Sequence, residues 1–252
     1  HEAWGALWKE LPFLSPPVRY FFRMLERIML RLPFEKYISV SESTRQQLMQ
    51  QGIKPEKISV IHNGLDGQWP KWEKPSGPFT FCFFGRAGIS KGLDLLIPAF
   101  ERLLEKHPGI RLKLIASPQS KKVERFIVKS IRKESVKGSI ERMSDLTQEQ
   151  LIAELLSSHC AVVPSYSEGF GFTAAEVTLM GLPLIHSGKG SLPEVTGGRV
   201  VVMQEQSVAG LRAAMERALT DDFDPVPVQK FSVEAFLHQH LELYREITGT
   251  SV

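Results

Sequence analysis

Two glutamates lie on either side of a glycine-flanked phenylalanine in the segment SEGFGFTAAE, at positions 167–176. Glu168 precedes the glycines, and Glu176 follows them within the next predicted helix. A carboxylate can accept hydrogen bonds from two neighbouring hydroxyl groups, and Gly169 and Gly171 leave backbone N–H groups uncovered. The segment therefore suits a polyhydroxylated ligand whose charged groups rest on the start of the helix.

Two other interpretations of this segment come from its residues alone. Glu176 is also explained as an acid that the helix dipole favours near a helix start. Gly169-x-Gly171-x-x-Ala174 also fits a relaxed dinucleotide-binding fingerprint. That fingerprint requires a strand directly before its first glycine, where SYSE intervenes, and an acid about 20 positions later, where IHSGKG has none. The dinucleotide interpretation is therefore disfavoured.

Two cations occur in the segment GRAGISKG, at positions 85–92. The segment is close to a phosphate-binding P-loop, but Ser90 replaces the second glycine, and Gly92 replaces the residue that would bind magnesium. What remains is a turn that carries Arg86 and Lys91 into a helix start, which favours an anion site. The alternative is that both cations are simply solvated at the edge of a loop.

The elements that must position these segments alternate between apolar strands and helices. FTFCFFG, IRLKLIAS, SIERMS, CAVVPS and LPLIHSG are predicted strands, and helical segments of 10–15 residues separate several of them. This alternation predicts an α/β fold with a doubly wound parallel sheet, in which ligands bind at the carboxyl ends of strands. GQWPKWEKPSGP, at 67–78, is predicted to be a linker, and DDFDPVPVQK a connector to the last helix.

Bulk composition excludes several classes of function. The chain has 252 residues, a net charge of +3 and a pI near 8.8, which is too weakly basic to indicate nucleic-acid binding. Cys82 and Cys160 lie in apolar runs, which predicts buried thiols, and no metal-binding spacing occurs. Neither a signal peptide nor an apolar run of about 20 residues is present. We therefore expect a cytoplasmic protein.

The segment 18–32 is predicted to be an amphipathic helix ended by Pro33. Arginines at 19, 23, 27 and 31 form a basic stripe beside apolar residues. That composition is typical of a helix on an anionic membrane, which would place the protein peripherally at the inner face. The alternative is that the apolar face packs on a sheet and the arginines are solvated.

These segments together resemble the retaining family-4 glycosyltransferases with the GT-B fold, also called glycosyl transferases group 1. GRAGISKGLDLLIPAF resembles the family's arginine–lysine loop, and PSYSEGFGFTAAEVTLMGLPLIHSGKGSLPEV resembles its E-x7-E segment. VSESTRQQL and ISVIHNGLD resemble the elements before its second domain. The resemblance implies the carboxyl-terminal part of an acceptor-side domain at 1–66, a linker at 67–78, a donor-binding domain at 79–228 and a terminal helix at 229–252 packing back toward the first domain.

The resemblance also assigns roles to residues. Arg86 and Lys91 would neutralise a diphosphate, Glu168 and the amides of Gly169, Phe170 and Gly171 would hold the donor sugar, and Thr173 would touch the diphosphate. Glu176 would bind the ribose, and His1 would match a histidine that contacts the sugar. The donor substrate is a nucleoside-diphosphate sugar. No cofactor or metal is implied, and Asp222-x-Asp224, a metal–nucleotide motif elsewhere, is discounted because it lies in the connector.

The expected function is transfer of a sugar, with retention of configuration, to an unknown acceptor that is a glycan or lipid-linked. Departures from the family pattern weaken the case for full activity, though not for the donor-site fold, and they leave an alternative open. Only the last part of a first domain is expected, IASPQS replaces a G-x-G after the second donor-domain strand, and TGGR replaces D-G-x-x-G. The alternative is a non-catalytic nucleotide-sugar-binding module, or a half-enzyme whose partner supplies the acceptor domain.

Overall fold

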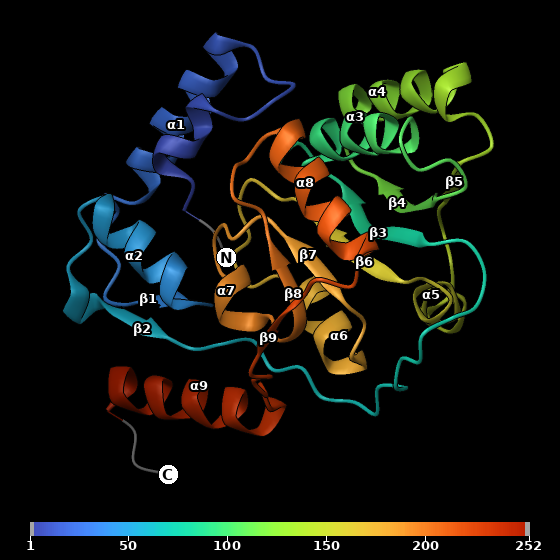
Figure 1. The fold of residues 1–252 in the computed structure, drawn as a ribbon. Coiled ribbons are helices and arrows are strands. Elements are labelled where there is room, and N and C mark those ends of the chain that lie inside the picture. Colours follow the sequence, from blue (N-terminus) through green and yellow to red (C-terminus); the bar gives the residue numbers. More distant parts are fainter. Residues whose placement is uncertain (1–2, 250–252) are drawn as a thin grey trace.

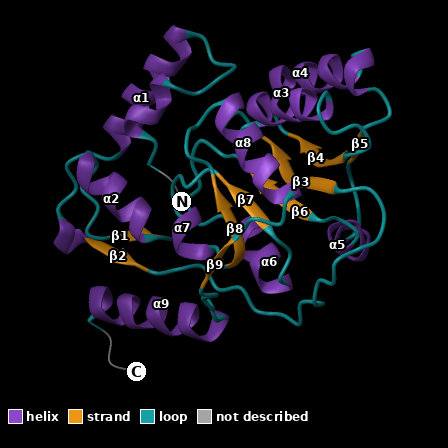
Figure 2. Ribbon diagram, viewed as in Figure 1, coloured by secondary structure: helices purple, strands orange, loops and turns teal. Residues whose placement is uncertain are grey.

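The computed structural model describes residues 3–249, which form a large and a small sheet with helices around them (Figures 1 and 2). The large sheet has seven strands in the order β5-β4-β3-β6-β7-β8-β9. All neighbours pair in parallel except β8 and β9. The strands are β3 (Thr80–Ala87), β4 (Arg111–Pro118), β5 (Ile140–Met143), β6 (Cys160–Val163), β7 (Leu184–His186), β8 (Gly198–Val202) and β9 (Asp224–Val226).

The central strand β3 shows why the sheet is covered on both faces. Phe81 and Phe83 are buried in one hydrophobic core, and Cys82 and Phe84 in another, because successive strand residues face opposite sides. The helices that close the first core are α3 (Leu93–Leu104), α4 (Lys121–Ile131) and α8 (Val208–Leu219). Those that close the second are α5 (Gln148–Leu156), α6 (Phe172–Met180) and α7 (Leu192–Val195). The doubly wound arrangement is thus confirmed.

The strand order reverses between β3 and β6, because β4 and β5 lie on one side of β3 and the later strands on the other. β3 pairs with β4 along its whole length, but it pairs with β6 only at Phe81 and Cys82. The carboxyl ends of β3 and β6 therefore separate, and the loops after them flank a crevice. Arg86, Lys91 and Glu168 all lie on this crevice.

The amino-terminal unit, residues 3–66, lies beside the large sheet (Figure 1). Strands β1 and β2 of this unit pair in parallel, with α2 between them in the chain. Its elements are a 3-10 helix (Gly5–Lys9), α1 (Pro16–Met29), β1 (Tyr37–Ser39), α2 (Glu42–Gln50), a second 3-10 helix (Pro55–Lys57) and β2 (Ile58–Val60). A further 3-10 helix (Glu134–Val136) follows α4 in the chain.

The last helix, α9 (Val233–Thr248), returns to the amino-terminal unit (Figure 1). Glu246 forms an ion pair with Lys36 at 3.2 Å. Just before the helix, the carbonyl of Phe231 accepts a hydrogen bond from the backbone N–H of Leu65 at 2.6 Å. The last helix and the segment before it are therefore tied to the amino-terminal unit.

Residues 67–78 contain neither helix nor strand, yet tertiary contacts hold them against the large sheet. The indole nitrogen of Trp72 donates to the carbonyl of Ser158 at 2.8 Å, and its backbone N–H donates to Met180 at 2.8 Å. Trp69 and Trp72 both pack against the second core. This segment is therefore anchored by aromatic side chains that its proline- and glycine-rich composition does not reveal.

Three local expectations were wrong. The connector contains the edge strand β9, where Pro225 is tolerated because an edge strand need not donate every backbone hydrogen bond. The helix α1 ends at Met29, before the predicted end at Leu32, and a turn precedes Pro33. Arg86 belongs to β3 itself and not to the loop after it. The sequence pattern also did not predict α8, whose cap is the hydroxyl of Ser207.

Candidate functional site

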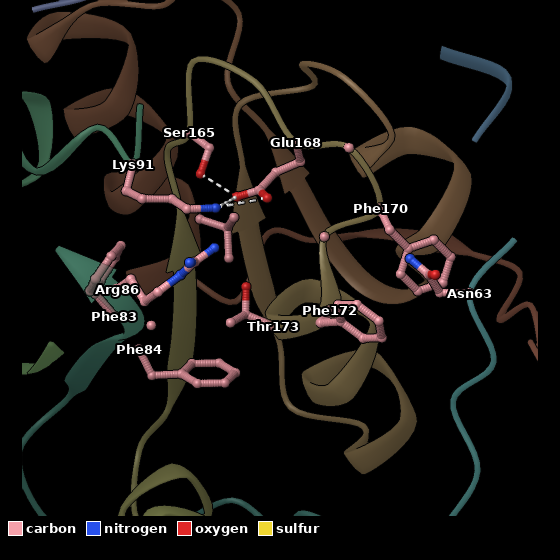
Figure 3. A pocket seen from close by; sticks show the side chains of 14 residues that line it. Asn63, Phe83, Phe84, Arg86, Lys91, Ser165, Glu168, Phe170, Phe172 and Thr173 are labelled. Atoms are coloured by element: carbon pink, nitrogen blue, oxygen red, sulfur yellow. Dashed lines mark hydrogen bonds and ion pairs between the residues drawn. The ribbon is translucent and has the colours of Figure 1, made fainter. Parts of the chain in front are cut away.

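A cleft of about 510 Å³ opens at the carboxyl ends of β3 and β6 (Figure 3). Its walls come from the end of β3, the loops before α3 and α6, and the first residues of α6. Asn63 from the amino-terminal unit completes the lining. Seven of the nine residues singled out from the sequence line this cleft together: Arg86, Lys91, Glu168, Gly169, Phe170, Gly171 and Thr173.

Glu168 is the most enclosed charged group of the cleft, with 6% of its surface exposed. The ammonium of Lys91 lies 2.7 Å from its Oε1 and 2.9 Å from its Oε2. The hydroxyl of Ser165 donates to Oε1 at 2.7 Å. A buried carboxylate needs such partners because burial penalises its charge. The two loops are thus joined by an ion pair between residues 77 positions apart.

The backbone of Glu168 is held from behind by the loop between β7 and α7. The N–H and the hydroxyl of Ser191 both donate to the carbonyl of Glu168, at 3.0 and 3.2 Å. Gly190 packs so closely that a Cβ there would lie 2.6 Å from the nitrogen of Glu168. Sequence reasoning assigned no role to either residue, although the motif GKGS that contains them belongs to the segment that resembles the family's E-x7-E region.

The start of α6 forms the floor of the cleft. Gly171 precedes the helix, and the backbone N–H groups of a helix start are directed away from the helix toward any ligand above it. The ring of Phe170 is buried and packs 5.2 Å from that of Phe231, which anchors the glycine loop to the segment before α9. Phe172 is exposed, and Thr173 lines the cleft.

Arg86 and Thr173 face the cleft from neighbouring elements (Figure 3). Arg86 is exposed at the end of β3, on the same side of the cleft as Lys91. Gly85 brings β3 close to α6, since a Cβ at this position would touch the methyl group of Thr173 at 3.5 Å. Two cations, a hydroxyl group and a helix start therefore converge, which is a favourable environment for an anion.

Glu176 lies one turn further along α6 and is not among the residues that line the cleft. Burial raises the pKa of its carboxyl to about 7. A carboxyl with a raised pKa takes up a proton near neutral pH, so its charge can respond to a ligand. The structure therefore places Glu176 on the same helix as Thr173 but outside the lining of the cleft.

Tyr166 ties the two loops together a second time. Its hydroxyl donates to Oδ2 of Asp94 at 2.7 Å, and its N–H donates to the carbonyl of Ser90 at 2.8 Å. Burial raises the pKa of Asp94, and the hydrogen bond from Tyr166 opposes that shift. No sequence signal pointed to this pair, because the partners lie 72 positions apart.

The other residues that the sequence singled out lie away from the cleft or outside the described residues. His1 lies outside the described residues. Asp222 and Asp224 both contact Arg217, at 2.7 and 3.4 Å, and are exposed. Among residues 3–249, no group of three or more histidine, cysteine or acidic side chains is arranged to hold a metal ion. Cys82 and Cys160 are buried free thiols, as predicted.

The described helices include none that is both long and apolar enough to span a bilayer. The arginine stripe, which runs along α1 and ends at Arg31 in the turn after it, is only partly available to a ligand. Arg19 donates to the backbone carbonyls of Leu14 and Lys9, at 2.9 and 2.6 Å. Arg23, Arg27 and Arg31 line a shallow groove with apolar side chains, and α1 contains no buried residue.

Comparison with known proteins places the cleft in a family context. Residues 68–231 match the model of "Glycosyl transferases group 1", and residues 1–69 match that of "Glycosyltransferase Family 4". Glycogen synthase of Mycobacterium tuberculosis is 33% identical over 170 residues, which cover 66% of this chain and 40% of the relative. The gpi3 subunit of phosphatidylinositol N-acetylglucosaminyltransferase from Schizosaccharomyces pombe is 26% identical over 82% of this chain and 45% of the relative. The chain thus spans less than half of these curated relatives.

Solved structures share the fold at low sequence identity. Sucrose-phosphate synthase from Thermosynechococcus elongatus has a TM-score of 0.77 and 21% identity, covering 100% of this chain and 67% of that one. HepE from Anabaena, solved in complex with UDP and glucose, has a TM-score of 0.69 and 16% identity, covering 88% of this chain and 66% of that one. With the family match over the whole large sheet, these comparisons show that the chain belongs to the glycosyl transferases group 1 family and has its GT-B fold.

Proposed function

We propose that this chain binds a nucleoside-diphosphate sugar in the cleft between β3 and β6 and transfers the sugar to an acceptor. The observation that carries the proposal is the pairing of Lys91 with the buried Glu168 beside the start of α6. This arrangement presents a cation, a carboxylate and free amides to a single ligand, and a nucleoside-diphosphate sugar has a complementary group for each.

Lys91 is suited to join the two halves of such a donor. An ammonium group has three N–H donors, and Glu168 takes up two of them. The third is left for an oxygen of the diphosphate. Glu168 has about four acceptor positions, of which Lys91 and Ser165 use three, so about one is left for a sugar hydroxyl. The same ion pair would then hold the phosphate and the sugar in a fixed relation.

The remaining roles follow from position. Arg86 would bind the diphosphate from the side of β3, and Thr173 with the amides at the start of α6 would bind it from below. The amides of Gly169, Phe170 and Gly171 would meet sugar hydroxyls. Glu176 would accept hydrogen bonds from the ribose, because its helix continues away from the diphosphate position.

The reaction breaks the bond between the anomeric carbon and the diphosphate oxygen and forms a bond from that carbon to an acceptor oxygen. Negative charge grows on the diphosphate as the bond breaks, so Arg86, Lys91 and the helix start stabilise the transition state more than the ground state. We propose that the leaving phosphate takes the acceptor's proton. Attack then comes from the face that the diphosphate leaves, and the configuration is retained.

For the acceptor we propose only a chemical class. Relatives are named for glycogen synthesis and for transfer of N-acetylglucosamine to phosphatidylinositol. Their acceptors are a glycan and a lipid, respectively, so we propose an acceptor of one of these classes. Fixed cations in the cleft supply the charge that stabilises the diphosphate, and we propose that no divalent metal is required.

Titration calorimetry with UDP, UDP-glucose, GDP and GDP-mannose tests donor binding. Arg86→Ala and Lys91→Ala should each make the free energy of binding of a nucleoside diphosphate less favourable by about 1.5–3 kcal/mol, the value expected for hydrogen bonds to charged groups. Lys91→Ala should also lower the melting temperature, because it leaves Glu168 buried without its cation. Arg86→Ala should not, because Arg86 is exposed.

Lys129→Ala is the matched control, since Lys129 is an exposed cation on α4 away from the cleft. It should leave binding unchanged, and binding should survive EDTA. Unchanged affinity in both cleft variants would refute the assignment of the diphosphate, and strict dependence on magnesium or manganese would refute the metal-free mechanism. Donor binding without turnover, in the presence of glycan and lipid acceptors, would instead support the non-catalytic binding module.

A further inference from the structure

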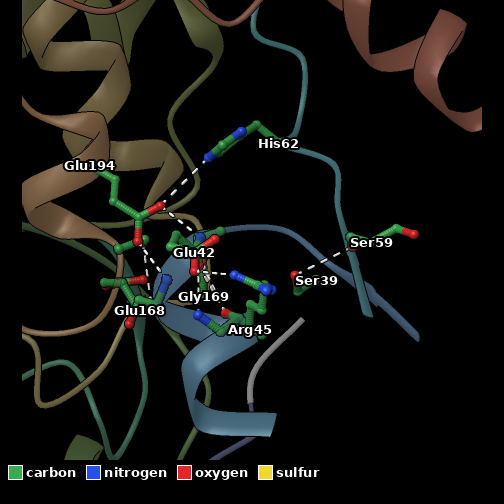
Figure 4. A network of polar contacts seen from close by, with 12 residues as sticks. Ser39, Glu42, Arg45, Ser59, His62, Glu168, Gly169 and Glu194 are labelled. Atoms are coloured by element: carbon green, nitrogen blue, oxygen red, sulfur yellow. Dashed lines mark hydrogen bonds and ion pairs between the residues drawn. The ribbon is translucent and has the colours of Figure 1, made fainter. Parts of the chain in front are cut away.

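Glu194 lies outside the cleft, at a point where α7 of the large-sheet unit meets α2 of the amino-terminal unit (Figure 4). Its Oε2 accepts the backbone N–H of Glu42 at 2.8 Å, and its Oε1 accepts that of Ser43 at 2.7 Å. These are the first two residues of α2. A carboxylate at a helix start is stabilised by both the hydrogen bonds and the helix dipole.

These contacts complete the hydrogen bonding of the α2 start from a distant part of the chain. The first N–H groups of a helix have no partner within the helix. The hydroxyl oxygen of Ser41 accepts a hydrogen bond from the backbone N–H of Thr44. The backbone N–H groups of Glu42 and Ser43, which come before Thr44, are instead bonded by Glu194. The Nε2 atom of His62 lies 3.5 Å from the same carboxylate.

The pKa of Glu194 reflects this environment. Burial is the largest single influence and raises it, but the contact with His62 and the two backbone N–H groups together lower it below the ordinary value for glutamate. The carboxylate is therefore ionised at neutral pH, and both of its oxygens are engaged across the boundary between the two units.

The same junction reaches the loop that carries Glu168 by two routes. Ser191, just before α7, donates twice to the carbonyl of Glu168. From the other side, the hydroxyl of Thr44 in α2 donates to the carbonyl of Gly169 at 3.4 Å. Glu194 therefore fixes α2 onto α7, and the backbone of Glu168 and Gly169 lies between contacts from both helices.

We propose that Glu194 is a positioning residue that clamps the start of α2 onto α7 and thereby holds the sugar-binding loop, residues 168–171, in place. The clamp acts on that loop and not on Arg86 or Thr173, which belong to β3 and α6. Loss of the clamp should therefore weaken the contacts with the sugar part of a donor and leave those with the nucleoside diphosphate unchanged. This last consequence rests on the proposed function, whereas the clamp itself does not.

Amide hydrogen exchange on the intact chain tests the clamp without any ligand. In Glu194→Ala, the amides of the first turn of α2 and those of residues 168–171 should both exchange about tenfold faster, since local opening replaces charge-assisted hydrogen bonds. Glu194→Gln preserves the size of the side chain and keeps one acceptor oxygen, so it should give a smaller increase at both places.

Ser41→Ala is the comparison variant, because it removes a cap from the same helix end without touching α7, and it reaches the loop only through the hydroxyl of Thr44. It should speed exchange in α2 and change exchange in residues 168–171 much less than Glu194→Ala does. If Glu194→Ala speeds exchange only in α2, or if Ser41→Ala loosens the loop equally, then Glu194 is merely a helix cap and the proposal is wrong.

A binding experiment with UDP and UDP-glucose adds a readout that a purely structural role would not change. Glu194→Ala should lower the affinity for UDP-glucose about tenfold, which is the loss expected for one charge-assisted contact. The affinity for UDP should change less than about twofold. Equal weakening of the two ligands would overturn the assignment to the sugar loop. If the wild-type chain binds neither probe, the proposed donor site fails for these nucleotides, and hydrogen exchange alone decides whether the clamp exists.

Discussion

At the scale of single residues, the cleft is organised by an ion pair and a hydrogen bond whose partners are far apart in the sequence. Lys91 reaches Glu168 across 77 positions, and Tyr166 reaches Asp94 across 72. Lys91 joins the loop after β3 to the loop after β6, and Asp94 joins the first turn of α3 to that same loop after β6. Lys91 and Ser165 supply hydrogen-bond donors to the buried carboxylate of Glu168, which places an acceptor for hydroxyl groups inside the cleft.

The carboxyl group of Glu176 should make donor binding depend on pH. Its pKa of about 7 is raised by burial, and hydroxyl groups of a ribose would donate to its ionised form. Ionisation becomes more complete as the pH rises through 7, so the affinity for UDP-glucose should rise roughly tenfold between about pH 6 and pH 8. UDP-glucose is the suitable probe because its phosphates keep the same charge across this range. Calorimetry at several pH values measures the effect.

Glu176→Gln should remove this pH dependence and weaken UDP as well as UDP-glucose at high pH. Glu168→Gln is the companion variant, since it should retain the pH dependence and spare UDP while it weakens UDP-glucose. A pH profile that is the same in wild type and Glu176→Gln would show that another group titrates, and identical ligand profiles for the two variants would contradict the division of their roles.

At the scale of elements, close backbone packing between loops decides where the carboxylate of Glu168 lies. Ser191 fixes the carbonyl of Glu168, and Gly190 allows the loop between β7 and α7 to approach it. Gly190 has φ +61°, a conformation that is unfavourable for residues with a side chain. A side chain at this position would therefore meet both backbone strain and a close neighbour, whereas glycines in open turns meet only the strain.

Gly190→Ala should therefore be more harmful than a glycine substitution that introduces only backbone strain. Its Cβ would overlap the backbone of Glu168, so we expect a loss of stability of about 2–4 kcal/mol together with weaker UDP-glucose binding. Gly181→Ala is the matched control, since Gly181 has φ +81° but no atom within 4 Å of the added Cβ. It should cost about 1 kcal/mol and leave binding unchanged. Denaturant unfolding and calorimetry compare them, and equal effects would argue against the close contact.

At the scale of the whole molecule, two units meet along α2, α7 and α9. The large sheet supplies the cleft, and the amino-terminal unit contributes Asn63 to its lining. Glu194 and the Lys36–Glu246 ion pair connect the units at separate places. The division into an acceptor-side part, a linker and a donor domain stays a prediction. The surface of α1 exposes apolar side chains beside a basic stripe, with Phe21, Ile28 and Met29 each more than half exposed.

The exposed surface formed by α1 and the turn after it should bind anionic membranes. Arg23, Arg27 and Arg31 should contribute about 1 kcal/mol each to binding of anionic vesicles, and the binding should be lost at high salt. Replacing these three arginines by glutamine should abolish it in a vesicle sedimentation assay. Glutamine at Lys121, Arg125 and Lys129, three exposed cations on α4, is the matched control and should not. Equal binding to neutral vesicles would favour the alternative that α1 exposes an apolar face that packs on protein.

The sequence by itself determined the class of the fold and most of the polar residues that line the cleft. Apolar strands alternating with helices specify a doubly wound sheet, and local spacing placed Arg86, Lys91 and Glu168 at the carboxyl ends of its strands. Only the tertiary structure decided how these groups are paired. The contacts of Lys91 with Glu168, of Glu194 with the start of α2, and of Ser191 with the Glu168 backbone join residues between 23 and 152 positions apart. Periodicity reports on neighbours within a turn or a strand, so it carries no information on such partners.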